Sequence, residues 1–287
     1  MAIQVTGLKK SFGKVEAVRG LNFSVPAGSI CGFLGRNGAG KTTTLKMLQG
    51  MIHPDAGHAT ILGLNIADPA QSVQIRQRAA FVTEEKGTLG YLKVSQVIKI
   101  TKAFYPNWSN EIEAKLLDTF EIPTDRRVSK LSKGGQTKLS LLLALARGAE
   151  MLILDEPTEG LDPAATEQLL QSLVVMSAES QTTVFFSSHQ LAEVEQIADR
   201  VVIIDKGVTV VEDSLDDLKH NYRRVRLVFD ATAPAIPGAR IDGRTASLLV
   251  RHDHAIDELR ALKPASLDID SVSLKEIFLD SVKGDRS

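Results

Sequence analysis

Residues 29–48 read SICGFLGRNGAGKTTTLKML, and this stretch decides the fold. It begins with a mostly apolar run that is typical of a buried strand, and Leu45, Leu48 and Ile52 follow at near-helical spacing. Between them lies GRNGAGKT (35–42), which matches the phosphate-binding pattern G-x-x-x-x-G-K-[ST]. A strand before the loop and a helix after it are the context that this pattern requires. The stretch predicts an α/β fold with a P-loop NTPase core.

Each position of the loop has a physical reason. Glycines let backbone N–H groups surround phosphate oxygens without a clash from Cβ, and the helix that follows directs its positive N-terminal end at them. We expect Lys41 to contact the β- and γ-phosphates, the Thr42 hydroxyl to ligate Mg²⁺, and Thr43 to bond the α-phosphate. The candidate nucleotide-binding residues of the loop are Gly35, Asn37, Gly38, Ala39, Gly40, Lys41, Thr42 and Thr43. The alternative is a chance glycine turn, and the motif alone does not separate a transporter from a kinase or a GTPase.

A second motif follows another apolar run. Residues 151–156 read MLILDE, so a buried strand would deliver two carboxylates to its carboxyl end, where ligands bind in open α/β sheets. Asp155 would hold Mg²⁺, usually through water, and Glu156 would act as the general base toward the attacking water. The alternative is a strand-to-turn transition with two solvated acids. Beside a P-loop, the catalytic interpretation is favoured.

Composition narrows the possible classes of protein. Of the 287 residues, 43% are hydrophobic, which is typical of a globular protein. The net charge of −1 lacks the strongly basic character of a nucleic-acid binder. The single cysteine, Cys31, excludes an intramolecular disulfide. The first residues show no signal-peptide pattern, and no apolar run approaches the ~20 residues that cross a bilayer. We therefore expect any membrane role to come through a partner.

The rest of the chain suggests two domains. Strand-like runs alternate with helical ones, which predicts a mostly parallel sheet covered on both faces. Residues 91–148 have helical periodicity and predict a helical subdomain inserted into this core. Composition shifts near residue 220, at a polar basic segment followed by ATAPAIPGAR (231–240). We expect one domain over 1–219 and a small α/β domain over 220–287.

Five motifs, in this order, resemble those of the nucleotide-binding subunits of ATP-binding-cassette (ABC) proteins. They are GRNGAGKTT (35–43), AAFVTEE (79–85), LSKGG (131–135), LDEPTEGLD (154–162) and SSH (187–189). The third is similar to the family signature L-S-G-G-Q, which kinases and GTPases lack. The resemblance covers about residues 1–219 and implies a RecA-like core.

The resemblance also implies roles for particular residues. In the family two cassettes stack head to tail, and each ATP lies between the P-loop of one and the signature of the other. Ser132 and Gly134 would then form a second phosphate cradle, ahead of a helix that starts at Thr137. His189 would bond the γ-phosphate, and Asp162 would communicate across the dimer. Simpler alternatives are a helix cap for Ser132 and a structural role for His189.

Two further roles rest on weaker matches. Phe12 stands where the family often stacks an aromatic ring on adenine, although core packing is the alternative for this residue. Glu84 stands where the family commonly has a glutamine, so it would contact Mg²⁺-bound water or the nucleophile. Lys133 replaces the first signature glycine, and Gly135 takes the place of the glutamine. These departures put the rate and symmetry of hydrolysis in question.

The predicted function is that of an ATP-binding and ATP-hydrolysing subunit that powers a transporter, with ATP and Mg²⁺ as cofactors. The expected partners are a separate integral-membrane permease and a second ATP-binding subunit, as homodimer or heterodimer, with no nucleic acid. The expected location is peripheral, at the cytoplasmic face of the plasma membrane. Resemblance favours an exporter, with FYPNW (104–108) either facing the permease or packing within the insert. The C-terminal domain would support dimerisation or regulation.

Two other functions are alternatives to this one. One is a soluble ABC-family ATPase in translation or DNA repair, but the chain has a single cassette and no sustained heptads. The other is a nucleotide switch that does not hydrolyse, and Glu156 and His189 argue against it because both would serve water activation.

Overall fold

The computed structural model describes residues 1–82, 90–251 and 254–282. The chain divides into two compact units, Met1–Glu212 and Asp213–Ser287. This division falls seven residues before the boundary expected from composition, because helix α8 (Leu215–Asn221) packs against α10 (Leu274–Ser281) and so belongs with the second unit.

The centre of the first unit is a six-stranded sheet in the order β10-β9-β3-β8-β7-β6. Its strands are β3 (Ile30–Gly35), β6 (Ala79–Val82), β7 (Met151–Leu154), β8 (Thr183–Ser188), β9 (Arg200–Asp205) and β10 (Val208–Ser214). The neighbours from β6 to β9 all run parallel. Strands β3, β7 and β8 are buried along their whole length, which explains their continuous apolar sequences. A mostly parallel α/β sheet was predicted, and the structure has one.

An antiparallel sheet lies against this core. It contains β1 (Ile3–Phe12), β2 (Val15–Val25), β4 (Ala56–Ile61) and β5 (Leu64–Asn65) in the order β2-β1-β4-β5. Phe23 of β2 stacks on Phe185 of β8 with ring centroids 5.7 Å apart, and Phe33 of β3 contacts both rings. One hydrophobic core therefore joins the two sheets, and it places β2 beside the strand that enters the P-loop.

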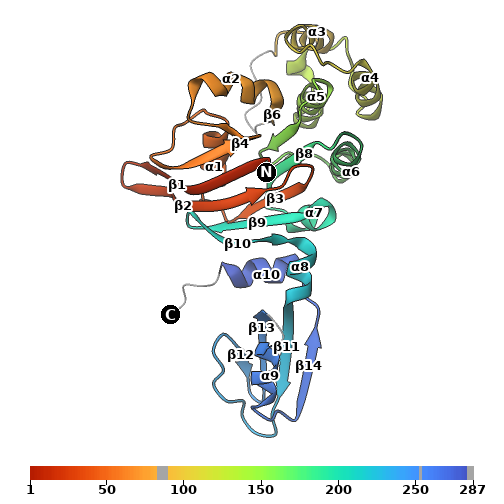
Figure 1. Cartoon of the computed structure of the whole chain (residues 1–287). Helices are drawn as coiled ribbons and strands as arrows, with labels where there is room; N and C mark the ends of the chain where they lie inside the picture. Colours follow the sequence, from red (N-terminus) through yellow and green to blue (C-terminus); the bar gives the residue numbers. More distant parts are fainter. Residues whose placement is uncertain (83–89, 252–253, 283–287) are drawn as a thin grey trace. The chain divides into compact units, whose positions relative to one another are not determined.

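Helices surround the sheets and form the insert. Those near the parallel sheet are α1 (Lys41–Leu48), α2 (Pro69–Arg78), α6 (Pro163–Ser180) and α7 (Leu191–Ile197). The insert contains α3 (Val94–Phe104), α4 (Asn110–Thr119), the short 3-10 helix η1 (Val128–Lys130) and α5 (Lys133–Ala146). Figure 1 shows α3, α4 and α5 gathered at one end of this unit.

The start of α5 differs from the prediction. The helix begins at Lys133, four residues before the expected start at Thr137. The reason is local, because Ser132 Oγ accepts a hydrogen bond from the Gly135 N–H at 3.0 Å and caps the first turn. The signature glycines are thus part of the helix rather than a turn before it.

The second unit has its own antiparallel sheet, ordered β12-β13-β11-β14. Its elements are α8, β11 (Tyr222–Val228), β12 (Arg240–Asp242), β13 (Thr245–Arg251), α9 (His254–Arg260), β14 (Ser266–Asp270) and α10. A separate core gathers around Val225, Leu227 and Ala246. Strand β12 was not predicted, because it is only three residues long and exposed throughout.

Within the described ranges, no helix combines the length and the apolar character needed to span a bilayer.

Candidate functional site

The P-loop is shaped by its glycines. Gly38 and Gly40 have φ values of 81° and 105°, a region that side chains rarely adopt. A Cβ on Gly40 would also lie 2.6 Å from the Ala17 carbonyl oxygen of β2. Gly40 is the N-cap of α1, so this close approach sets where the N-terminal end of the helix points. The loop requires glycine here for backbone angle and for space.

The loop wraps around Lys41, which is only 8% exposed. Its Nζ donates a hydrogen bond to the Gly35 carbonyl oxygen at 2.7 Å. Ala39 is also buried, and its N–H donates to the Arg36 carbonyl oxygen at 3.0 Å. Gly35 and Ala39 therefore stabilise the loop through hydrogen bonds within it.

A cavity of about 720 Å³ opens at this loop. It is lined by Val15, Glu16, Ala17, Arg36, Asn37, Gly38, Gly40, Lys41, Thr42, Thr43, Glu156, Glu159 and His189. The volume lies within the range of ~300–1,000 Å³ usual for ligand sites. Residues from β2, the P-loop and the ends of two parallel strands meet here, at the carboxyl edge of the sheet.

The acidic strand end is anchored by Ser187 on the neighbouring strand. Ser187 Oγ donates to Asp155 Oδ1 at 2.7 Å and accepts the Glu156 N–H at 2.9 Å. Burial raises the pKa of Asp155 above its usual range, and the hydrogen bond from Ser187 opposes that rise. Glu156 has a φ of 46°, unusual for a residue other than glycine. Strain of this kind is often found at functional sites.

Glu156 lies between two predicted partners. Its Oε2 lies 2.8 Å from His189 Nδ1 and also accepts the His189 N–H at 3.2 Å. Its Oε1 lies 3.9 Å from Lys41 Nζ. The fold thus brings together three residues that lie far apart in the sequence and were predicted as catalytic.

The remaining predicted residues are placed differently. Phe12 is half exposed and does not line the P-loop cavity, and Lys10 Nζ lies 5.7 Å from its ring centroid. Core packing, the alternative for Phe12, is wrong because the residue is 51% exposed. Glu84 lies outside the described residues. Asp155 is buried behind Glu156 rather than at the cavity wall.

The signature residues line a different cavity of about 690 Å³. Around it stand Phe120, Glu121, Pro123, Arg126, Lys130, Leu131, Ser132, Lys133, Gly134, Gly135, Lys138, Gly160, Leu161, Asp162 and Ala165. Asp162 caps α6 by accepting the Ala165 N–H at 2.9 Å. In the described part of the chain, no residue lines both this signature cavity and the P-loop cavity. Within one chain the two halves of the predicted site are therefore separate.

Sequence reasoning missed several lining residues. Arg36 is a variable position inside the loop motif, so its arginine carried no signal. Val15, Glu16 and Ala17 reach the P-loop cavity only because β2 crosses beside it. The basic residues Arg126, Lys130 and Lys138 join Lys133 around the signature cavity. An anion is the ligand that such a basic cavity favours.

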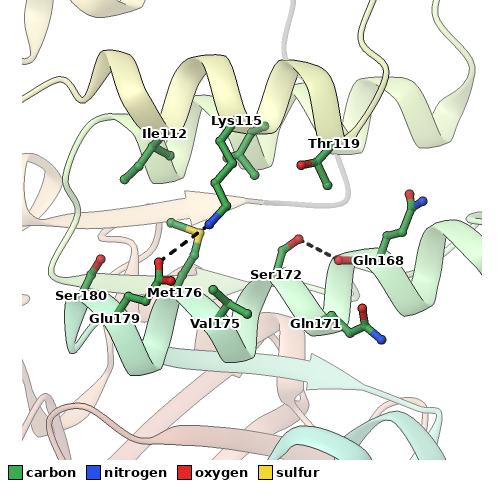
Figure 2. Close-up of a pocket in the computed structure, with 11 residues that line it drawn as sticks. Ile112, Lys115, Thr119, Gln168, Gln171, Ser172, Val175, Met176, Glu179 and Ser180 are labelled. Atoms are coloured by element: carbon green, nitrogen blue, oxygen red, sulfur yellow. Dashed lines mark hydrogen bonds and ion pairs between the residues drawn. The ribbon is translucent and has the colours of Figure 1, made fainter.

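A third cavity, of about 220 Å³, lies between α4 of the insert and α6 of the core. Figure 2 shows Ile112 and Lys115 of α4 facing Val175, Met176 and Glu179 of α6 across it. Among the residues that the structure describes, none that belongs to the five motifs lines this cavity.

Comparison with known proteins places this geometry in a family. Residues 18–159 match the family model described as ABC transporter. The bacitracin transport ATP-binding protein BcrA of Bacillus licheniformis is 37% identical over 77% of this chain and 72% of its own. The daunorubicin/doxorubicin resistance ATP-binding protein DrrA of Streptomyces peucetius is 31% identical over 98% and 91%. A solved ATP-binding subunit of an ABC transporter superposes with a TM-score of 0.69 and 26% identity, over 77% of this chain and 92% of that one.

The chain belongs to the ABC transporter family. It is an ATP-binding subunit of that family, its core is the P-loop NTPase fold, and its enzymatic activity is ATP hydrolysis in transport. The resemblance drawn from the five motifs is confirmed.

Proposed function

We propose that this chain drives export through a separate permease by hydrolysing ATP between its own P-loop and the signature segment of a second ATP-binding subunit. The observation that carries the proposal is the grouping of Lys41, Glu156 and His189 at the cavity beside the N-terminus of α1. A cation, an acid and an imidazole beside a glycine loop can together bind a γ-phosphate and activate a water molecule, which is the chemistry of ATP hydrolysis.

The P-loop residues suit the triphosphate. Backbone N–H groups of residues 38–43 and the N-terminus of α1 would cradle the phosphates, with Lys41 at the β- and γ-positions and Thr43 at the α-phosphate. The half-exposed ring of Phe12 would stack on the adenine at the cavity margin.

The donor set also fits Mg²⁺. The Thr42 hydroxyl and the Asp155 carboxylate are hard oxygen ligands, the type that this ion prefers. Burial raises the pKa of Asp155, and a nearby cation would favour its charged form. When bound, the ion would neutralise charge on the β- and γ-phosphates.

Glu156 would accept the proton of the attacking water. Its contact with the ring of His189 would orient the imidazole, which would hydrogen-bond the γ-phosphate. Glu84, which lies outside the described residues, would contact Mg²⁺-bound water or the attacking water.

The separation of the two cavities supports a dimer. Because the P-loop and signature cavities share none of the described residues, one chain offers half of a two-sided site at each. Ser132, Gly134 and the basic residues around them would contact the γ-phosphate of an ATP held by the second subunit, and Asp162 would lie at the junction. Head-to-tail stacking would complete two such sites, in a homodimer or a heterodimer.

The insert supplies a surface for a permease. Tyr91, Ile100 and Phe104 are exposed, whereas Trp108 is buried and donates its Nε1–H to Glu113 at 2.6 Å. We propose that these three exposed apolar side chains meet the permease at the cytoplasmic face of the plasma membrane. Export as the direction is supported by relatives such as the Nod factor export ATP-binding protein I of Bradyrhizobium diazoefficiens, 34% identical over 76% of this chain.

The substitution Glu156→Gln tests the proposal. The amide cannot accept the proton of water, so we expect kcat to fall at least 100-fold, while the Kd for Mg²⁺-ATP stays within about threefold of wild type. With ATP the variant should also sediment as a dimer, because the sandwich forms and does not turn over.

The matched control is Glu167→Gln, a carboxylate on the exposed side of α6 that should leave all three measurements unchanged. Near-normal turnover by the Glu156 variant would contradict its assignment as the base, and a monomer at saturating ATP would contradict the sandwich.

A further inference from the structure

A buried carboxylate on α7 is not explained by any of the roles above. Glu193 is 6% exposed, and its Oε2 accepts two hydrogen bonds, from Thr158 Oγ1 at 2.8 Å and from Ser188 Oγ at 3.0 Å. Both hydroxyl groups belong to residues that are themselves almost fully buried. The second oxygen, Oε1, is buried and has no hydrogen-bond partner in the described part of the chain.

The two donors belong to the segments that carry the catalytic pair. Thr158 lies two residues after Glu156, and Ser188 immediately precedes His189. Glu156 Oε2 and His189 Nδ1 are themselves 2.8 Å apart. Glu193 therefore closes a ring of contacts, in which one of its oxygen atoms accepts a hydrogen bond from each of the two segments.

This arrangement is a costly way to obtain stability. Burying a carboxyl group with one unpaired oxygen is unfavourable, and an apolar side chain of similar size would fill the space without that cost. A shared acceptor instead fixes the positions of the two hydroxyl groups relative to each other, because both must lie within hydrogen-bonding distance of one atom.

Ser187 makes a different connection between the same strands. Its hydroxyl holds the Asp155 carboxylate and the Glu156 N–H at the point where β7 ends. The Ser187 hydroxyl makes no hydrogen bond to Thr158 or His189 in the described part of the chain. Among the described residues, Glu193 is thus the side chain that links Thr158 to Ser188 through hydrogen bonds.

We propose that Glu193 is a positioning residue for ATP hydrolysis: by binding Thr158 and Ser188 together, it sets the distance between the Glu156 carboxylate and the His189 imidazole. The inference rests on the proposed function, since it assumes that these two groups act on water and on the γ-phosphate. Glu193 itself would contact neither the water nor the γ-phosphate. Its loss should therefore lower the rate of turnover and leave nucleotide binding intact.

The experiment measures kcat and the Kd for Mg²⁺-ATP in the full-length chain. For Glu193→Ala we expect a fall in kcat of about tenfold or more with Kd within twofold of wild type. Glu193→Gln should keep kcat within about threefold, because its amide oxygen accepts both hydroxyl groups. Gln196→Ala, on the exposed side of the same helix, is the matched control and should behave as wild type. Wild-type kcat in the alanine variant, or a glutamine variant as slow as the alanine one, would overturn the proposal.

Two smaller changes keep the test decisive if Glu193→Ala does not fold. Thr158→Val and Ser188→Ala each remove one donor, and each should lower kcat about three- to tenfold at unchanged Kd. Wild-type kcat in both would overturn the proposal.

A double-mutant cycle separates positioning from a general loss of structure. Because Glu193 acts through the pair, Glu193→Ala should slow a His189→Ala chain less than twofold, whereas multiplicative losses would overturn the proposal. The Glu156→Gln variant keeps the two hypotheses distinct: normal turnover there defeats the proposed function, whatever the result at Glu193.

Discussion

Asp155 and Glu156 are consecutive carboxylates with different surroundings. Asp155 is buried and bonded to Ser187, and its raised pKa shows that the folded chain disfavours its charge. Glu156 faces the P-loop cavity, with His189 and Lys41 beside it. One residue step along the chain thus separates a buried candidate for a metal ligand from a candidate base that faces the cavity.

The raised pKa of Asp155 predicts a gain in stability on removing the charge. A folded-state pKa above the unfolded value means that the stability contributed by the protonated group is present at low pH and lost as pH rises through the folded pKa. At pH 7, without Mg²⁺ or nucleotide, Asp155→Asn should therefore raise Tm, and the difference should shrink as pH falls toward 4.

The control for this measurement is Glu150→Gln. A hydrogen bond from Arg78 lowers the pKa of Glu150, so this substitution should not raise Tm at pH 7. A lower Tm for Asp155→Asn at pH 7 would contradict the prediction that burial of the Asp155 charge destabilises the folded chain.

At the scale of elements, α4 and α6 meet across a cavity rather than a filled interface. Leu116 of α4 is buried and lines the cavity, whereas Lys115 and Glu179 form an ion pair at 3.8 Å across its margin (Figure 2). The side chains of the pair are 60% and 66% exposed. Apolar packing and surface charge can therefore be compared at neighbouring residues of one helix.

We expect Leu116→Ala to lower the free energy of unfolding by about 2–4 kcal/mol, because it removes buried methyl groups beside an existing cavity. Lys115→Ala should change it by less than about 0.5 kcal/mol, since water screens an exposed pair. Urea denaturation of both variants measures the contrast. Equal losses would contradict the prediction, because they would mean that the exposed ion pair stabilises the chain as much as the buried apolar side chain does.

At the scale of the molecule, the two units have separate cores. The first unit contains both sheets that meet at Phe23, Phe33 and Phe185, and the second has its own cluster around Val225 and Leu227. The P-loop and signature cavities lie wholly in the first unit. A ligand that binds only this unit should stabilise it without acting on the other core.

Calorimetry should therefore resolve two unfolding transitions, and Mg²⁺-ATP should move only one of them. At 100 times Kd the shift corresponds to about 2.7 kcal/mol. The Glu156→Gln chain suits the measurement because it should keep the nucleotide intact. An equal shift of both transitions would contradict this prediction. It would show that the two units unfold together, as expected if the second unit supports the dimer.

Local sequence was sufficient where the chemistry lies within a few consecutive residues. GRNGAGKTT requires glycine angles and a helix N-terminus, and MLILDE places two acids at the end of a buried strand, so both sites follow from short-range rules. Helix starts were less predictable. The earlier start of α5 depended on a Ser132 cap that competes with the low helix propensity of two glycines.

Sequence by itself therefore determined the family, the P-loop and the acidic strand end, because each is a pattern of neighbouring residues. Only the tertiary structure decided that β7 and β8 lie side by side, and with them Glu156, His189 and the Glu193 connection. It alone also showed that the P-loop and signature line separate cavities. The physical reason is that sheet order and strand register, which no local pattern encodes, decide which strand ends meet.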